Sequence, residues 1–380
     1  MVVFFTIFFT VYAAINYYVF IRGWQALSSL PHLKPFYAVI FVIAATSYII
    51  AKFLDGKIPH LVYDAMIWIG SFWFAFMLYF FLSIILIDLI RLLNWKLDFF
   101  PQIINNNYEN VKRYLLAFVM LISSVIIFIG YLNTRKISVK SLSLEITRKQ
   151  SALTELNAVV LSDLHLSTIN GEKLLSQIVA KLNELKTDVV FIPGDIVDDR
   201  AETLKSEGIG VSLSKIKSKY GVFASTGNHE YINGINGTCK FITENGITLI
   251  RDSSLLIADS FILAARDDAS KNSFAKQRRK SLEEIISNAN QNYPIILLDH
   301  TPFRLEEAEI NGISLQLSGH THHGQMFPLN FITKLIYEVS WGYKKKDNTH
   351  YYVSCGVGTW GPPVRLGSES EIVNIKIKLR

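Results

Sequence analysis

Histidine, aspartate and asparagine side chains gather in five short clusters of the sequence. They offer imidazole, carboxylate and amide ligand atoms, a mixture that suits zinc, manganese or iron better than magnesium or calcium. Six of the nine histidines fall in or directly beside these clusters. An isolated Asp or His at the end of a strand is more often a helix cap or turn residue, but several clusters together favour a metal site. The clusters are "DLH" (Asp163, His165), "GD" (Gly194, Asp195), "GNHE" (Gly227, Asn228, His229, Glu230), "DHTP" (His300) and "GHTH" (His320, His322).

Each cluster follows a short apolar run that is typical of a buried strand. Amphipathic segments such as "GEKLLSQIVAKLNELK" lie between these runs and predict helices, so the pattern from about Ser138 onward is one of alternating strands and helices. In open α/β sheets, ligands bind outside the carboxyl ends of the strands. We therefore expect the clusters to meet at one edge of a sheet, with Asp195 as the bridge between two ions. The expected strands are "NAVVLSD", "DVVFIPGD", "YGVFASTGNHE", "PIILLDH" and "SLQLSGHTH".

The stretch "LSGHTHHGQ" contains three histidines, and their spacing separates them. His320 and His322 are two residues apart, so an extended strand end would point both to the same side. His323 would then point away. We expect His323 to be a surface or supporting residue before the turn at Gly324, with no place among the metal ligands.

The order of these clusters resembles the calcineurin-like metallophosphoesterase superfamily. The likeness covers roughly residues 155–380, and the tail "YYVSCGVGTWGPPVRLGSESEIVNI" further resembles the bacterial membrane-associated branch of YkuE-like and YaeI-like proteins. It implies a four-layer α/β/β/α sandwich as the catalytic domain. Two positions depart from the expected pattern: His323 stands where glycine is expected, and Glu230 stands where aspartate is commoner.

The resemblance also implies roles for individual residues around two divalent ions, which together can clamp a phosphate and lower the pKa of a water molecule. His229 would donate a hydrogen bond or a proton to the phosphate or leaving group, oriented by Glu230. Asn228 and Arg365 would contact substrate, although Arg365 could equally form a structural ion pair. The catalytic residues would be His229 and the bridging ligand Asp195. The implied ligands are Asp163, His165, Asp195 and His322 for one ion, and Asp195, Asn228, His300 and His320 for the other.

The N-terminal third is too apolar for an ordinary soluble protein. The whole chain of 380 residues is 50% hydrophobic, with a mean hydropathy of +0.27, and its apolar residues concentrate before about residue 135. "FWFAFMLYFF" shows no polar face at helical spacing. We expect a multi-pass transmembrane domain over 1–135, a linker with a first strand over 136–154 and the catalytic domain over 155–380. The expected spans are 2–21, 35–51, 65–87 and 114–134.

Charge gives little reason to expect a nucleic-acid partner. Residues 1–135 contain nine lysines and arginines against five acidic residues, and the remainder contains 29 against 27. The high pI thus reflects cations that flank the membrane segments, and no basic face of the kind that binds nucleic acid is evident. Cys239 and Cys355 form no disulfide or zinc pattern. The segment 251–280 matches no known ligand pattern, so the sequence assigns it no role.

Three functions fit these observations. The first is a membrane-tethered dinuclear phosphoesterase that acts on a lipid-linked or envelope phosphodiester or pyrophosphate. The second is a cytosol-facing hydrolase of a UDP-diacylglucosamine type of pyrophosphate in lipid A synthesis. The third is a catalytically idle membrane scaffold, which a lost ligand would favour, but every ligand position is filled.

The predicted side of the cell membrane for the catalytic domain depends on which lysines and arginines are counted. With four crossings, short loops place Arg22, Lys34, Arg91, Lys96, Lys112 and Arg113 on one side and Lys52 and Lys57 on the other. Cytoplasmic loops carry the excess of lysine and arginine, so this count favours an extracytoplasmic domain. Adding Arg135, Lys136 and Lys140 makes the tally six against five and leaves the orientation open.

Overall fold

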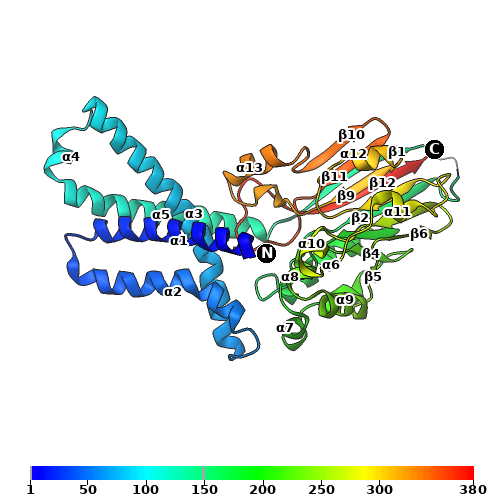
Figure 1. Ribbon diagram of the computed structural model, residues 1–380, viewed down its shortest axis with the longest axis horizontal. Helices are drawn as coiled ribbons and strands as arrows, with labels where there is room; N and C mark the ends of the chain where they lie inside the picture. The colour runs from blue at the N-terminus through cyan, green and yellow to red at the C-terminus, as the bar shows by residue number, and fades with distance from the viewer. Residues whose placement is uncertain (1, 148–149) are drawn as a thin grey trace. The chain divides into compact units, whose positions relative to one another are not determined.

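The computed structural model describes residues 2–147 and 150–380 of the chain (Figure 1). Its contacts divide into two compact units. One comprises Met1–Tyr131 with Gly361–Val364, and the other Leu132–Trp360 with Arg365–Arg380. The boundary falls four residues before the predicted end of the membrane domain at residue 135.

The first unit is helical and mostly apolar. Three helical stretches within the described residues are long and apolar enough to cross a membrane: Pro31–Phe53, His60–Leu97 and Tyr108–Thr134. They contain three of the four predicted spans. The fourth, 2–21, falls on α1, where the side chains of residues 2–5 lie outside the described part, so this crossing stays a prediction. The helices are α1 (Val2–Ala26), η1 (Pro31–Leu33), α2 (Lys34–Phe53), α3 (His60–Leu97), α4 (Gln102–Asn106) and α5 (Tyr108–Thr134).

Aromatic side chains join the first three long helices. The rings of Phe41 and Trp73 meet edge to face with centroids 4.7 Å apart. The indole of Trp73 donates a hydrogen bond of 2.9 Å to Oδ1 of Asn16, so this buried amide has a partner. A side chain at Gly70 would come within 2.4 Å of Tyr48, so the close approach of α2 and α3 requires glycine there.

The second unit contains two six-stranded sheets. The first has the order β1-β12-β2-β3-β4-β5, with β2 to β5 parallel; the second has the order β10-β11-β9-β8-β7-β6, with β7, β8, β9 and β11 parallel. The strands are β1 (Ile137–Ile146), β2 (Glu155–Val160), β3 (Val189–Pro193), β4 (Val222–Ser225), β5 (Thr248–Leu249), β6 (Ser253–Ile257), β7 (Phe261–Ala265), β8 (Ile295–Leu298), β9 (Leu315–Ser318), β10 (Gly342–Lys346), β11 (Thr349–Val353) and β12 (Ser370–Leu379).

Alternation along the strands sends side chains to opposite faces of each sheet. Val190 packs outward against helix residues such as Leu175, whereas its neighbour Phe191 points into the core between the sheets. There the rings of Phe191 and Phe261 lie edge to face, 6.2 Å apart. Helices also cover the outer face of the second sheet, so the predicted four-layer α/β/β/α sandwich is confirmed (Figure 1). The helices are α6 (Glu172–Glu184), α7 (Ala201–Ser206), η2 (Val211–Lys215), α8 (Asn228–Ile232), α9 (Ile235–Glu244), α10 (Ser270–Phe274), α11 (Leu282–Ile286), α12 (Glu306–Ile310), η3 (His322–Gly324) and α13 (Leu329–Ile336).

β1 extends the sandwich beyond the predicted catalytic boundary at residue 155. It pairs in parallel with β12 over its whole length, from Ile137 opposite Ser370 to Ile146 opposite Leu379. Most of the segment predicted as a linker with a first strand therefore forms the edge of the first sheet.

Candidate metal centre

The predicted ligands follow strands of both sheets and meet in space. Asp163 and His165 come after β2, Asp195 after β3, and Asn228 begins α8 directly after β4. From the second sheet, His300 follows β8, and His320 and His322 follow β9. The carboxyl ends of parallel strands thus bring these side chains together, as the sequence predicts.

One group consists of Asp163, His165 and His322. The Nε2 atoms of the two histidines lie 3.0 Å apart, and Asp163 Oδ1 lies 3.4 Å from Nε2 of His322. All three side chains are buried. Nitrogen and oxygen lone pairs that converge on one point in a dry site fit a cation, because burial without one would leave them poorly compensated.

A second group consists of Asp195, His300 and His320, with Asn228 beside it. His300 Nε2 lies 3.0 Å from Asp195 Oδ2, without the angle of a hydrogen bond, and His320 Nδ1 lies 2.9 Å from Asn228 Oδ1. His300 Nδ1 lies 2.8 Å from the carbonyl oxygen of Pro193. A proton placed there leaves the lone pair on Nε2, the tautomer that a metal ligand needs.

Asp195 lies between the two groups. Its Oδ2 atom is 3.0 Å from His300 Nε2 and 3.7 Å from His165 Nε2, so one oxygen faces both sets. Burial raises the pKa of Asp195, but in the metal-free chain, where His300 can be protonated, the charges of His300 and His229 outweigh this effect and hold the pKa well below its usual range. The position fits the predicted bridging role.

The ligand loops have left-handed backbone conformations that non-glycine residues rarely adopt. Such conformations each cost on the order of 1–3 kcal/mol and persist only where the surrounding fold imposes them. This finding corrects the premise that His320 and His322 continue an extended strand. The φ angles are 54° at Asp163, 46° at His165, 52° at Asp195, 71° at His320 and 45° at His322.

His320 and His322 in fact belong to different groups, and His323 belongs to neither within the described residues. His323 is buried, so of the two expected positions the surface one is wrong and the supporting one fits. Its Nδ1 lies 3.0 Å from the Ser340 hydroxyl oxygen, and its ring packs on Trp341 with centroids 5.2 Å apart. His323 thus supports the ligand loop through its contacts with Ser340 and Trp341.

Asp198, which the sequence analysis missed, orients His229. Its Oδ1 atom lies 2.5 Å from His229 Nδ1, and a ring nitrogen of His229 lies within 4.8 Å of ligand atoms of His165 and Asp195. Burial lowers the pKa of His229, but the carboxylates of Asp198 and Asp195 outweigh it and raise the pKa to about 9. The only signal in the sequence is the extra acidic pair in "GDIVDDR".

The predicted orienting role of Glu230 is wrong. Its carboxylate accepts hydrogen bonds from the backbone amides of Asp195 (3.1 Å), Ile196 (2.7 Å), Val197 (3.2 Å) and Gly227 (2.7 Å). Glu230 therefore fixes the loop after β3 against the start of α8.

The surroundings of Arg365 also differ from those expected of a residue that contacts a substrate phosphate. Its side chain is fully buried, and Nη2 donates to the carbonyl oxygens of Cys355 (2.9 Å), Gly356 (3.1 Å) and Gly358 (2.5 Å). Nη1 donates to the Ser368 hydroxyl at 3.1 Å. These bonds hold the guanidinium inside the loop that follows β11. We therefore assign Arg365 a structural role, which it fulfils through hydrogen bonds to the loop rather than through the ion pair expected as the alternative.

Two glycines allow the ligand loops to approach closely. A side chain at Gly227 would come within 2.2 Å of Asp195 Oδ1, and one at Gly319 within 2.1 Å of Asp163 Oδ2. Both carboxylates would have to move, so these glycines are part of the site's geometry.

Part of the segment 251–280 forms ion pairs beside the site. Arg251 pairs with Asp267 at 2.9 Å, and Asp267 accepts a hydrogen bond of 2.8 Å from Thr226. Arg279 lies 3.3 Å from Asp299, the residue before His300. The segment thus supports strand ends that carry ligands.

Comparison with known proteins gives a consistent result. A family model described as "Calcineurin-like phosphoesterase" matches residues 156–324. An uncharacterized metallophosphoesterase of Campylobacter jejuni is 31% identical over 281 residues, which is 72% of each chain. An uncharacterized metallophosphoesterase of Helicobacter pylori is 32% identical over 228 residues, 59% of this chain and 60% of the relative.

One vertebrate relative is named as a transmembrane protein. This "Transmembrane protein with metallophosphoesterase domain" of Danio rerio is 32% identical over 271 residues, 68% of this chain and 62% of the relative. The chain thus spans about 60% of the length of several relatives that it matches. Together with the three apolar helices, these matches identify a membrane protein.

Proposed function

Because the chain belongs to the calcineurin-like phosphoesterase family, we propose that it is a membrane-tethered dinuclear metallophosphoesterase that cleaves a lipid-linked or envelope phosphodiester or pyrophosphate. The observation that carries this proposal is the pair of ligand groups around Asp195. The scaffold alternative is not favoured, because every predicted ligand position is filled.

The ligand sets are those that the family resemblance implies, and the two groups support them. Asp163, His165, Asp195 and His322 would hold one ion, and Asp195, Asn228, His300 and His320 the other. Their mixed nitrogen and oxygen atoms suit manganese, zinc or iron. When bound, such ions polarise phosphoryl oxygens and make hydroxide available at neutral pH.

His229 would hold the proton that the leaving oxygen needs. Asp198 at its Nδ1 side fixes the ring and stabilises the protonated form, although bound cations would oppose this effect on the pKa. Its buried position limits competing proton exchange with water. Asn228, next to His229, would contribute its side-chain oxygen as a ligand and contact substrate.

An exposed apolar surface supports a lipid-linked substrate. We call it the apolar ledge; it begins beside the second ligand group, where the rings of Tyr337 and His320 lie 6.1 Å apart and Phe303 stacks on Tyr337 at 4.7 Å. Large exposed apolar patches on water-soluble surfaces commonly mark lipid or partner contacts. The ledge comprises Phe303, Phe327, Phe331, Ile332, Leu335 and Ile336, each about half exposed or more.

The test is a hydrolysis screen on the detergent-purified chain with manganese, zinc, iron or magnesium. Substrates should include lipid-linked diesters, nucleotide-linked lipids and a water-soluble aryl phosphodiester. Leu335→Ser should weaken turnover of the lipid-linked diester and spare the aryl diester, because Leu335 is 88% exposed on the ledge. Ile310→Ser, at an 80% exposed position on α12 outside the ledge, is the matched control. Equal loss of turnover on both substrates would contradict the role of the ledge. Absence of hydrolysis with all four metals would contradict the proposed phosphoesterase activity.

The short-loop charges favour an extracytoplasmic catalytic domain. A single cysteine engineered on its surface, in a chain without Cys239 and Cys355, should react with an impermeant thiol reagent in intact cells whose outer membrane is permeabilised. Protection from the reagent would reverse this orientation and favour the nucleotide-linked lipid, since UDP-sugars are made and used in the cytosol.

A further inference from the structure

The helical unit contains a cavity of about 830 Å³ that the hydrolytic reaction does not use. Its walls come from α1, α2, α3, α4 and α5, and most of its lining side chains are aliphatic or aromatic. Its volume falls within the roughly 300–1,000 Å³ that is usual for small-molecule sites. The apolar walls include Phe41, Trp73, Phe80, Leu116 and Met120.

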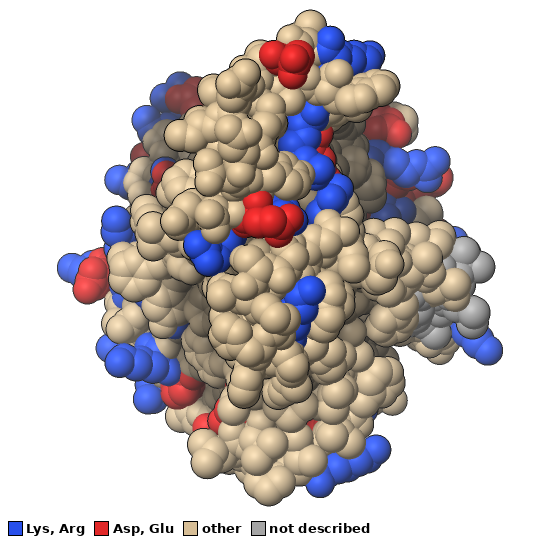
Figure 2. Space-filling model, turned by 90° about the vertical axis from the view of Figure 1, so that its left-hand side faces the viewer, with Lys and Arg blue, Asp and Glu red and all other residues tan. Residues whose placement is uncertain are grey.

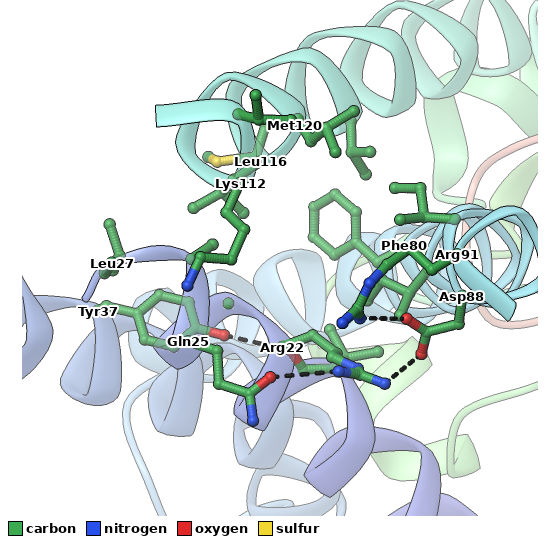
Figure 3. A pocket seen from close by; sticks show the side chains of 18 of the residues that line it. Arg22, Gln25, Leu27, Tyr37, Phe80, Asp88, Arg91, Lys112, Leu116 and Met120 are labelled. Atoms are coloured by element: carbon green, nitrogen blue, oxygen red, sulfur yellow. Dashed lines mark hydrogen bonds and ion pairs between the residues drawn. The ribbon is translucent and has the colours of Figure 1, made fainter. Parts of the chain in front are cut away.

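The polar part of the lining is basic. Arg22 lies near the end of α1, Asp88 and Arg91 in the last third of α3, and Lys112 near the start of α5. Figure 3 shows that Arg22 and Arg91 approach the same carboxylate, Asp88, while Lys112 reaches in from the opposite wall. These helix ends share one membrane side in the expected topology, so the cations lie at the level of lipid headgroups.

The charges at this end do not balance. Arg22 and Arg91 share Asp88, and the Tyr18 hydroxyl also donates to Asp88 at 2.5 Å. Lys112 pairs at 2.6 Å with Glu109, which is outside the cavity lining. Three cations thus face two carboxylates. Within the described residues, the Arg91 guanidinium makes one hydrogen bond, at 3.0 Å to Asp88, and keeps further N–H groups for an anion.

The surface around this end is mostly uncharged, with scattered basic side chains and fewer acidic ones (Figure 2). Free inorganic phosphate would fit the cations but would leave the apolar cavity unfilled. A neutral lipid would fill the cavity but would leave the surplus positive charge without a partner. An anionic amphiphile satisfies both parts, and basic pockets between transmembrane helices are suited to anionic headgroups.

We propose that this cavity binds one anionic phospholipid, with the phosphate at Arg22, Arg91 and Lys112 and an acyl chain along the apolar walls. The proposal does not depend on the hydrolytic function. It predicts a lipid that copurifies with the chain from membranes and that supports the packing of α1, α3 and α5.

Native mass spectrometry of the full chain in neutral detergent tests this proposal, because the mass reports both binding and whether the lipid is intact. Dioleoyl phosphatidylglycerol should form a one-to-one complex and raise the unfolding temperature, whereas dioleoyl phosphatidylcholine and inorganic phosphate should not. The double variant Arg91→Gln, Lys112→Gln should bind phosphatidylglycerol on the order of tenfold more weakly.

Arg113→Gln is the matched control, because Arg113 neighbours Lys112 in sequence and does not line the cavity. It should retain wild-type affinity. Leu116→Trp, which fills the cavity and keeps every charge, should also lose the lipid while the chain remains folded. Equal binding of phosphatidylcholine, equal loss in Arg113→Gln, full binding in folded Leu116→Trp, or phosphate binding as tight as lipid binding would each overturn the proposal.

Discussion

Asp198 Oδ1 lies 2.5 Å from Nδ1 of His229, and this contact sets both the direction of the imidazole and its affinity for a proton. A carboxylate at this distance favours the charged ring, which is the form that donates a proton. The pair therefore predicts how the rate of hydrolysis depends on pH.

Removal of the Asp198 charge should lower the pKa of His229, because one of the carboxylates that oppose the effect of burial would be lost while the effect of burial remains. In Asp198→Asn, the fall in kcat/KM on the alkaline side should shift to lower pH, since the protonated ring is lost earlier as pH rises. Asp199→Asn is the control, because Asp199 accepts a hydrogen bond from the Thr168 amide instead. An unchanged alkaline limb in Asp198→Asn would show that His229 is not the acid.

His229→Ala should separate chemistry from metal binding. We expect the rate to fall by roughly 10²–10⁴-fold, the usual contribution of a general acid, while metal content measured by mass spectrometry stays near that of the wild type. Parallel loss of metal and rate would make His229 a ligand.

Asp195→Asn should reduce both metal content and hydrolysis sharply, since one carboxylate oxygen faces both ligand groups. Replacement of the carboxylate by an amide keeps the shape and removes the charge that two cations share. Metal content and turnover should be measured on the same preparation. Near-normal values for both would exclude a dinuclear centre bridged by Asp195.

The neighbouring histidines should behave differently. His322→Ala should lose metal, whereas His323→Ala should keep metal and lose stability, because it removes the contacts to Ser340 and Trp341. A loss of about 1–2 kcal/mol would lower the unfolding temperature by several degrees. Equal metal loss in the two variants would contradict the assignment of His323 to the support of the loop.

Arg365→Met should destabilise the chain rather than weaken substrate binding alone. It leaves several loop carbonyls without their donor, at about 1–3 kcal/mol for each buried unpaired group. We expect a clear drop in unfolding temperature, whereas Arg380→Met, which removes an exposed arginine paired with Glu145, should leave it unchanged. A raised KM at unchanged stability would restore the phosphate-binding role.

The sequence predicts the convergence of the ligands well, because side chains that follow parallel strands share one edge of the sheet for any conformation of the loops. It predicts the direction of individual side chains poorly. His320 and His322 turn through left-handed conformations that the two-residue period of a strand does not anticipate. Asp198 takes the orienting role that was expected of Glu230, because tertiary packing decides which carboxylate reaches the ring and which reaches the backbone amides.

Glu230 joins the peptide segment that bears Asp195 to the helix start that bears Asn228 through four backbone amides. These two ligand carriers should therefore move as one rigid body, and their spacing should exist before any ion arrives. Under that condition, loading of the centre requires little reorganisation, and the amide protons of Asp195, Ile196 and Val197 should exchange slowly with deuterium even in the metal-depleted protein.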